Sequence, residues 1–161
     1  MLAEGDRIHM ASKITGTFTA NDVPGDHNLV LVATGTGVAP FLSMLRTTST
    51  WTSGRRITLV HGVRYVSDLA YREELEALQL SRRDFSYFNI VSRADESWQG
   101  QRGYVQRFFE EGRVALDAQR DHVFLCGNPA MIDQMEAWLS DRGYSEHTRK
   151  NPGNLHLERY W

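Results

Sequence analysis

The stretch LVLVATGTGVAPFLSML, residues 29–45, indicates the fold of this chain. Residues 29–33 form an apolar run typical of a buried strand, and from Val38 to Leu45 the apolar residues recur at the spacing of an amphipathic helix. A short turn of glycine and threonine joins the two patterns. The sequence therefore predicts a strand that runs directly into a helix.

The turn itself, Thr34 to Gly37, favours an anion site. Glycines allow a ligand to approach the backbone closely, and the N-terminus of a helix offers N–H groups and the positive end of its dipole to a phosphate. The hydroxyl groups of Thr34 and Thr36 add donors suited to a phosphate or to the edge of a flavin. Pro40 stands where the dinucleotide-binding fingerprint has its third glycine, so close packing of helix on strand is not implied and a plain tight turn is the alternative.

Strand-like and helical patterns alternate along the rest of the chain. Further strands are expected at 56–61, 85–92, 122–126 and 156–161, and further helices at 71–78, at 104–110 and between Asn128 and Gly143. Asn128 is a good N-cap, and Gly143 would end that last helix. This alternation predicts an α/β fold: a doubly wound, five-stranded parallel sheet.

Residues 1–27 do not fit the alternation. Arg7 to Met10 and Thr17 to Ala20 look like short strands, which alone cannot make a stable domain. Two interpretations stay open: an ordinary N-terminal extension, or the remnant of an antiparallel β-barrel. The predicted division is a barrel remnant at 1–27 and a nucleotide-binding domain at 28–161.

The composition of the chain excludes several classes of protein. A net charge of -2 over 161 residues predicts no broad attraction to nucleic acid or to an anionic membrane. No apolar run has the length of a membrane span, and the N-terminus lacks the apolar stretch of a signal peptide. The lone Cys126 allows no internal disulfide, and the histidines lack metal-ligand spacing, so we expect a cytoplasmic protein without a metal.

Three arginines are expected at one edge of the sheet: Arg64 and Arg93 follow predicted strands, and Arg102 lies in the loop between Gly100 and Gly103. The carboxyl ends of parallel strands share one edge of the sheet, where open α/β sheets bind their ligands. Each arginine alone could be an ordinary surface residue, but together they suit the 2′-phosphate of NADP, which guanidinium groups match well. NAD sites usually place an acidic residue on the ribose hydroxyl. In the loop after Ser92 the first side chain is Arg93, and Asp95 and Glu96 come later in the sequence, which favours NADP over NAD.

Two further features lie near the same predicted edge. Cys126 ends an apolar strand, where it is either a packed small hydrophobe or part of a site. The chain ends in Glu158, Arg159, Tyr160 and Trp161, and two terminal aromatic residues need a covering surface. They would pack on their own domain or stack on an isoalloxazine or adenine ring.

Taken together, the motifs resemble the bacterial ferredoxin/flavodoxin NADP reductases. The resemblance covers nearly the whole chain from about Asn28, in the family's order and with similar separations. Upstream, EGDRIHM (4–10) and GTF (16–18) resemble the last strands of that family's flavin-binding barrel. The five motifs are LVATGTGVAPFLSMLR (31–46), LVHGVRYVSDLAYREELE (59–76), VSRADESWQGQRGYV (91–105), VFLCGNPAMIDQMEAWL (123–139) and ERYW (158–161).

The resemblance implies roles for individual positions. Cys126 would lie beside the path of the nicotinamide ring, Tyr160 would shield the flavin face, and Trp161 would lie near the adenine of FAD. Glu158 would be a carboxylate near the flavin. The implied catalytic residues are Cys126, Glu158 and Tyr160, and the implied cofactor-binding residues are Thr34, Gly35, Thr36, Gly37, Val63, Arg64, Ser92, Arg93, Arg102, Gly127, Asn128, Met131, Tyr160 and Trp161.

The implied activity is hydride transfer between NADPH and FAD, coupled to electron exchange with ferredoxin or flavodoxin, in a protein that is expected to be monomeric. The family's arginine-x-tyrosine-serine motif, which holds the flavin, does not occur in these residues. A flavin converts hydride into single electrons and side chains cannot, so this chain alone should be a poor catalyst. Two alternatives are a non-catalytic NADP-binding module and the reductase component of an oxygenase.

Overall fold

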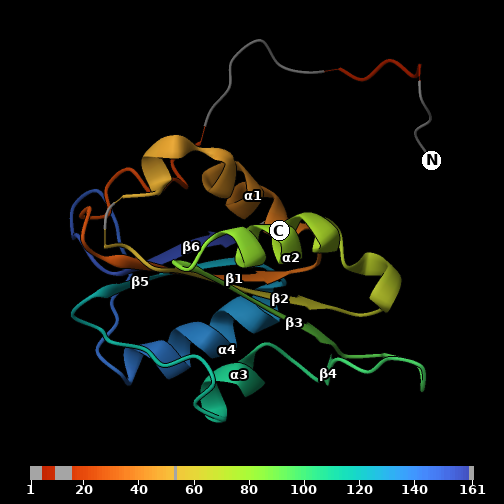
Figure 1. Ribbon diagram of the computed structural model, residues 1–161. Coiled ribbons are helices and arrows are strands. Elements are labelled where there is room, and N and C mark those ends of the chain that lie inside the picture. Colours follow the sequence, from red (N-terminus) through yellow and green to blue (C-terminus); the bar gives the residue numbers. More distant parts are fainter. Residues whose placement is uncertain (1–4, 10–15, 53, 160–161) are drawn as a thin grey trace.

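The computed structural model describes residues 5–9, 16–52 and 54–159. Its centre is a parallel sheet in the order β4-β3-β2-β1-β5-β6 (Figure 1). The strand order reverses between β1 and β5, which is where a doubly wound sheet has its ligand crevice. The strands are β1 (Asn28–Thr34), β2 (Ile57–Val63), β3 (Phe85–Val91), β4 (Gln101–Arg102), β5 (Asp121–Gly127) and β6 (Leu155–Arg159).

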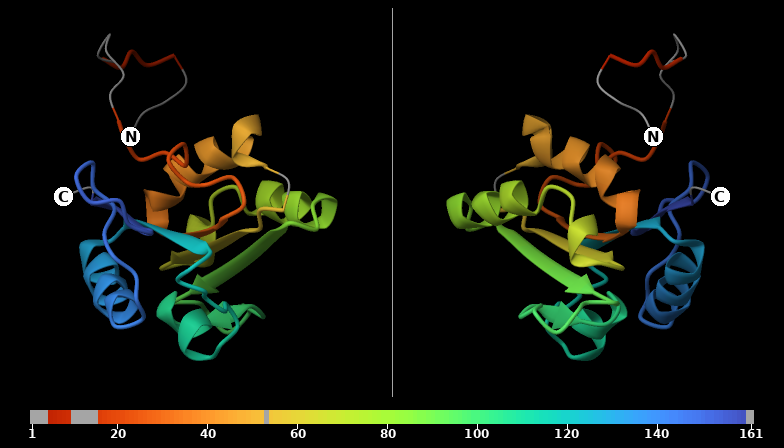
Figure 2. Two further views of the ribbon diagram at one scale, coloured as in Figure 1. Left: turned by 90° about the vertical axis from the view of Figure 1, so that its left-hand side faces the viewer. Right: turned by 90° about the vertical axis from the view of Figure 1, so that its right-hand side faces the viewer.

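Helices cover both faces of the sheet. α1 (Ala39–Arg46) and α2 (Arg72–Ser81) lie on one face, and α3 (Gln106–Glu110) and α4 (Pro129–Ser140) on the other, as Figures 1 and 2 show. Three short 3₁₀ turns, η1 (Gly35–Val38), η2 (Thr48–Thr50) and η3 (Val66–Asp68), complete the described elements. The predicted doubly wound α/β fold is confirmed.

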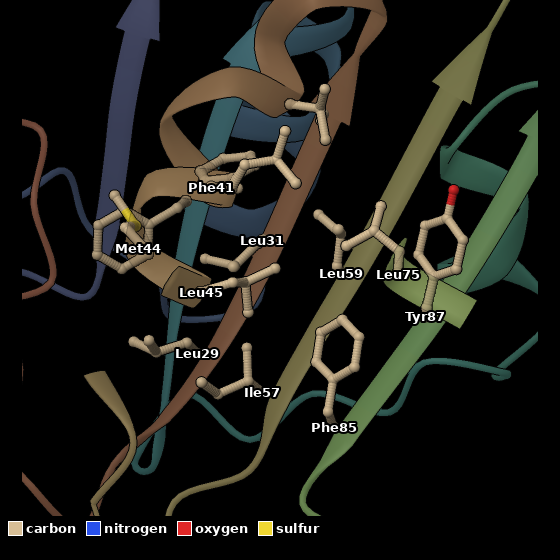
Figure 3. Packing of buried hydrophobic residues seen from close by; sticks show 14 of the residues in the cluster. Leu29, Leu31, Phe41, Met44, Leu45, Ile57, Leu59, Leu75, Phe85 and Tyr87 are labelled. Atoms are coloured by element: carbon tan, nitrogen blue, oxygen red, sulfur yellow. The ribbon is translucent and has the colours of Figure 1, made fainter. Parts of the chain in front are cut away.

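Each face of the sheet has its own apolar core. Alternate residues of β1 and β2, such as Leu31 and Leu59, meet Phe41 and Leu45 of α1 on the first face (Figure 3). The residues between them point to the opposite face, where they meet α3 and α4. Every residue of β5 is buried, as expected for a central parallel strand covered on both sides.

The sheet has one strand more than predicted. β4 is only two residues long and pairs with Ile90 and Val91. Such a short strand leaves no period-2 pattern to find in a sequence. The last strand starts at Leu155 and is described to Arg159, so Tyr160 and Trp161 lie outside the described residues.

The predicted strands near the N-terminus are wrong where they can be checked: the structure has no strand before Asn28 in residues 5–9 and 16–27, and residues 10–15 lie outside the described part. A strand requires a hydrogen-bonding neighbour, and none of the described strands pairs with residues 5–9 or 16–27. Residues 5–9 lead away from the packed body (Figures 1 and 2), whereas residues 16–27 pack on it. The Phe18 ring lies 5.4 Å from that of Phe124, centroid to centroid.

A buried arginine fastens this segment, which we call the N-terminal strap (residues 16–27). Arg55 is only 3% exposed. Its guanidinium donates to the carbonyl groups of His27 (2.8 Å), Pro24 (2.7 Å) and Val23 (3.2 Å), and also to that of Thr50 (3.1 Å). The strap therefore packs as part of the same body as the sheet.

Candidate functional site

The predicted site positions that the structure describes fall mainly along the carboxyl edge of the sheet. Strand register aligns them: Ala33 pairs with Cys126, Cys126 with Glu158, and Val91 with Arg102. Since neighbouring strands are about 4.8 Å apart, the edge from β3 to β6 spans about 19 Å. An extended ligand can lie along this edge.

The glycine turn after β1 lies at the middle of the edge. Gly35 has a φ of +55°, and a Cβ atom placed on it would meet nothing within 4 Å. Both Gly35 and Thr36 are exposed, and η1 leads straight into α1 with Pro40 in its first turn. This turn therefore leaves open space above a helix N-terminus, the arrangement that suits a phosphate.

The turn is held tightly against the end of β5. A Cβ on Gly37 would lie 2.3 Å from the Cys126 carbonyl oxygen, and one on Gly127 would lie 2.3 Å from the Thr34 hydroxyl oxygen. That hydroxyl oxygen accepts a 2.8 Å hydrogen bond from the Asn128 N–H. The turn is therefore packed closely against the end of β5, and Gly37 and Gly127 are the glycines that allow this contact.

A buried histidine on β2 contacts the glycine turn. Its role was not predicted from the sequence. His61, at 0% exposure, has its Nε2 atom 3.1 Å from the Gly35 carbonyl oxygen. A carbonyl only accepts, so Nε2 must carry the proton and donate. Burial lowers the pKa of His61, which keeps the ring neutral. The only indication in the sequence was that His61 is a polar residue at the end of the predicted strand 56–61.

Arg64 and Arg93 are exposed at neighbouring strand ends. The β2–β3 ladder continues beyond the strands, since the Arg93 N–H donates to the Arg64 carbonyl (2.8 Å). The Tyr65 side chain raises the pKa of Arg93, and the nearby Tyr104 acts in the same direction. Both tyrosines are largely exposed, and neither was picked out from the sequence.

Arg102 lies at the same edge, but its guanidinium binds carbonyl oxygens of the protein itself. Its guanidinium donates to the carbonyl oxygens of Ala94 (2.8 Å), Asp95 (2.6 Å) and Trp98 (2.9 Å). It therefore holds the loop between β3 and β4. Of the three arginines, Arg64 and Arg93 are exposed, whereas the guanidinium of Arg102 is bonded to carbonyl oxygens of the loop.

Cys126 and Glu158 form the other end of the edge. The Cys126 thiol is fully buried, and its Sγ atom lies 3.8 Å from Glu158 Oε2, in a donor geometry. Next to them, Arg159 pairs with Glu136 of α4 at 2.6 Å. A polarised thiol and a partly exposed carboxylate therefore lie side by side on β5 and β6.

Several predicted positions support the edge rather than face it. Val63 is 7% exposed and packs with Leu69 and Val91, while Met131 is 6% exposed within the core under α4. The Asn128 side chain accepts the Ala130 N–H at 2.9 Å and caps α4. Ser92 Oγ donates to the Val63 carbonyl at 3.3 Å.

Four histidines gather at the opposite edge of the sheet, although their sequence spacing did not suggest it. His122 Nδ1 lies 3.0 Å from His156 Nε2, and the rings of His27 and His147 lie against this pair. In the described part of the chain, no group of three or more histidine, cysteine, aspartate or glutamate side chains is arranged to hold a metal ion. Nor does that part contain a helix long and apolar enough to span a membrane.

Comparisons with known proteins agree with this geometry. Residues 31–137 match the family described as Oxidoreductase NAD-binding domain. The chain is 34% identical over 172 residues to a ferredoxin-NADP reductase of Pseudomonas aeruginosa, covering 98% of this chain and 66% of that protein. It is 32% identical over 165 residues to a flavodoxin/ferredoxin-NADP reductase of Buchnera aphidicola, with 97% and 66% covered.

Other relatives extend this picture. The anthranilate 1,2-dioxygenase electron transfer component of Acinetobacter baylyi is 30% identical over 131 residues, which is 81% of this chain and 37% of that protein. Among solved structures, a ferredoxin NADP+ reductase from Neisseria gonorrhoeae with bound FAD and NADP superposes with a TM-score of 0.75 at 25% identity. That match covers 89% of this chain and 60% of the other. The chain thus spans about two thirds of the length of the reductases it resembles, and the resemblance seen in the motifs is confirmed.

Proposed function

Because the chain belongs to the family of oxidoreductase NAD-binding domains, we propose that it is the NADP(H)-binding part of a ferredoxin or flavodoxin NADP reductase. The proposal is supported by the arrangement of chemical groups along the carboxyl edge of the sheet. An open glycine turn lies at its middle, two exposed arginines at one end, and a thiol beside a carboxylate at the other.

We assign the parts of the coenzyme to three places on the edge. The pyrophosphate lies on the turn from Thr34 to Gly37, where the helix N-terminus and the backbone N–H groups suit it. The 2′-phosphate lies at Arg64 and Arg93, whose guanidinium groups offer forked donors. The nicotinamide end then lies along β5 and β6, toward Cys126.

The chemical contribution of this chain is positioning. Cys126 and Glu158 are adjacent, with the thiol in contact with the carboxyl group, and we assign this pair to the nicotinamide end. The barrier to transfer falls when the reacting ring is held at the right distance and orientation. Bound FAD supplies the exchange between hydride and single electrons. The described residues that suit a flavin are the exposed Thr36 and the partly exposed Glu158; the roles of Tyr160 and Trp161 remain proposals.

The intact protein would exchange electrons with ferredoxin or flavodoxin as a cytoplasmic monomer. Residues 1–27, which form no strand in the described ranges 5–9 and 16–27, would be the end of a flavin-binding barrel that the rest of the intact protein completes. A second candidate is a non-catalytic NADP-binding module, consistent with the match of residues 31–137 to an NAD-binding domain. A pure preparation that is colourless and binds NADP would support the module. A yellow preparation with diaphorase activity would support the reductase. The reductase component of an oxygenase is a third candidate, consistent with the similarity to the Acinetobacter protein.

The direct test is Arg93→Ala. We expect the affinity for NADP+ to fall by about 10- to 100-fold, the value of one or two charge-assisted hydrogen bonds, while the affinity for NAD+ stays within about threefold. Isothermal titration of both coenzymes measures this. Equal losses for NADP+ and NAD+ would show that Arg93 does not bind the 2′-phosphate.

A further inference from the structure

A cleft of about 490 Å³ lies at the amino edge of the sheet, where β2 and β3 begin. Ile57 and Phe85, the first residues of these strands, are partners in the sheet and lie side by side (Figure 3). The ladder continues before them, because the Ile57 N–H donates to the Asp84 carbonyl at 2.8 Å. Since β2 is seven residues long, the cleft lies about 20 Å from the carboxyl edge that we assign to the coenzyme.

The lining of this cleft is strongly basic. Its only acidic residue is Asp84, which stands against four arginines: Arg55, Arg56, Arg82 and Arg83. The whole chain has a net charge of -2, so the part of the chain outside the cleft is net acidic. Positive charge is therefore concentrated at this place on the amino edge.

Two of the four guanidinium groups form part of the fold. Arg55 is buried and donates to four carbonyl groups, three of them in the N-terminal strap. Arg82 donates to both carboxylate oxygens of Asp84, at 3.0 and 2.7 Å, and its guanidinium lies 3.9 Å from the centroid of the Trp51 ring. The Trp51 indole N–H in turn donates to the Leu45 carbonyl at 2.8 Å. These contacts give the cleft fixed walls.

The other two arginines, Arg56 and Arg83, are exposed. Within residues 5–9, 16–52 and 54–159, neither side chain is paired with a carboxylate. They stand just before neighbouring strands, where their like charges repel each other. An anion bound at both would offset this repulsion and accept charge-assisted hydrogen bonds from them.

The surroundings of the two exposed arginines favour a carboxylate over a phosphate. Asp84 lies among the arginines, and its charge repels a doubly charged phosphate more strongly than a singly charged carboxylate. The half-buried Trp51 ring offers an apolar surface to the stem of an acidic side chain. A long polyanion such as nucleic acid would extend beyond the cleft over a net acidic surface, which disfavours it.

We propose that this amino-edge cleft is a docking site for a short acidic segment of a partner protein, whose carboxylates bind Arg56 and Arg83. The site lies at the opposite edge of the sheet from the proposed coenzyme site and does not depend on it. A partner and a coenzyme can therefore be bound at the same time.

The experiment uses capped hexaglutamate as the probe and measures its dissociation constant for the full chain by isothermal titration. The double variant Arg56→Gln with Arg83→Gln should weaken binding by about 10-fold or more, because charge-assisted hydrogen bonds to both guanidinium groups are lost. The matched control, Arg120→Gln with Arg149→Gln, removes the same charge from two other exposed positions. Its affinity should stay within about threefold of the parental value.

Competition identifies the kind of ligand and its place. Saturating NADP+ should change the affinity for hexaglutamate by less than about threefold at about 0.1 M salt, because the two edges are further apart than a Debye length. Displacement of the peptide by NADP+ would put the peptide at the carboxyl edge and overturn the proposal. So would no measurable binding of hexaglutamate, equal losses in the two double variants, or tighter binding of tripolyphosphate than of hexaglutamate.

A measurement on the unmutated chain avoids any effect of substitution on folding. In the ¹⁵N-labelled chain, hexaglutamate should move the indole N–H resonance of Trp51 and the backbone amides of Arg56 and Arg83. The amides of Gly35 and Arg93, at the carboxyl edge, should stay in place. Shifts concentrated at Gly35 and Arg93 would contradict the proposal.

Discussion

His61 shows how one buried residue can control an exposed site. Its Nε2–H donates to the Gly35 carbonyl, so it orients the peptide that enters the glycine turn. We expect His61→Leu to weaken NADP+ and NAD+ alike, by about 5- to 10-fold, because the pyrophosphate is common to both and one hydrogen bond is worth about 1 kcal/mol. His61→Gln, which keeps a donor, should stay within about threefold.

Titration of both coenzymes separates this effect from that of Arg93. A loss confined to NADP+ would contradict the place given to His61, as would a glutamine variant no better than the leucine variant. The sequence placed Thr34, Gly35 and Gly37 correctly at the turn, because glycine patterns report backbone geometry directly. It could not reveal His61, since the contact depends on the packing of β2 beside β1.

Among the helices and strands, the order along the chain was predictable from the sequence. The edge strand β4 and the packing of the N-terminal segment were not. Apolar runs and helical spacing identified the elements around β1, β2, β3 and β5, since these are buried and periodic. The two-residue β4 and the packing of residues 16–27 depend on contacts between distant segments. Likewise, the sequence showed that Arg102 lies at the sheet edge, but not that its donors are directed at the loop.

The N-terminal strap provides a test at this scale. Arg55→Met removes four bonds from a buried guanidinium to carbonyl groups, three of them in the strap. We expect the free energy of unfolding to fall by about 3 kcal/mol, since buried acceptors lose charged donors. Arg56→Met, at the exposed neighbouring position, should change it by less than about 0.5 kcal/mol. Urea unfolding of both variants measures the difference, and equal small losses would show that the strap is not held by Arg55.

For the whole molecule, the buried histidine pair predicts sensitivity to acid. Burial lowers the pKa of His122 to about 4 and that of His156 to about 3, with nearby histidines acting in the same direction. The unfolded chain takes up protons below about pH 6.5, where the folded chain does not. The folded state should therefore be most stable above about pH 6.5.

Below that pH, the free energy of unfolding should fall by about 1–3 kcal/mol per pH unit, until the folded pKa values are reached. The buried His61, whose pKa is also lowered, adds to the loss. Urea unfolding at pH 7, 6 and 5 checks this prediction, and His156→Gln should make the dependence shallower. A stability that does not change between pH 7 and pH 5 would contradict it.

We propose that an NADP coenzyme lies along the carboxyl edge of the sheet, with its 2′-phosphate at Arg93. The most direct measurement is a titration of the ¹⁵N-labelled chain with NADP+, followed by the backbone amide resonances. We expect the largest shifts in Gly35 to Val38, Ser92, Arg93 and Gly127, and almost none in Arg56, Arg83 or Arg120 at the opposite edge. Shifts concentrated at the opposite edge, or spread evenly over both, would contradict it.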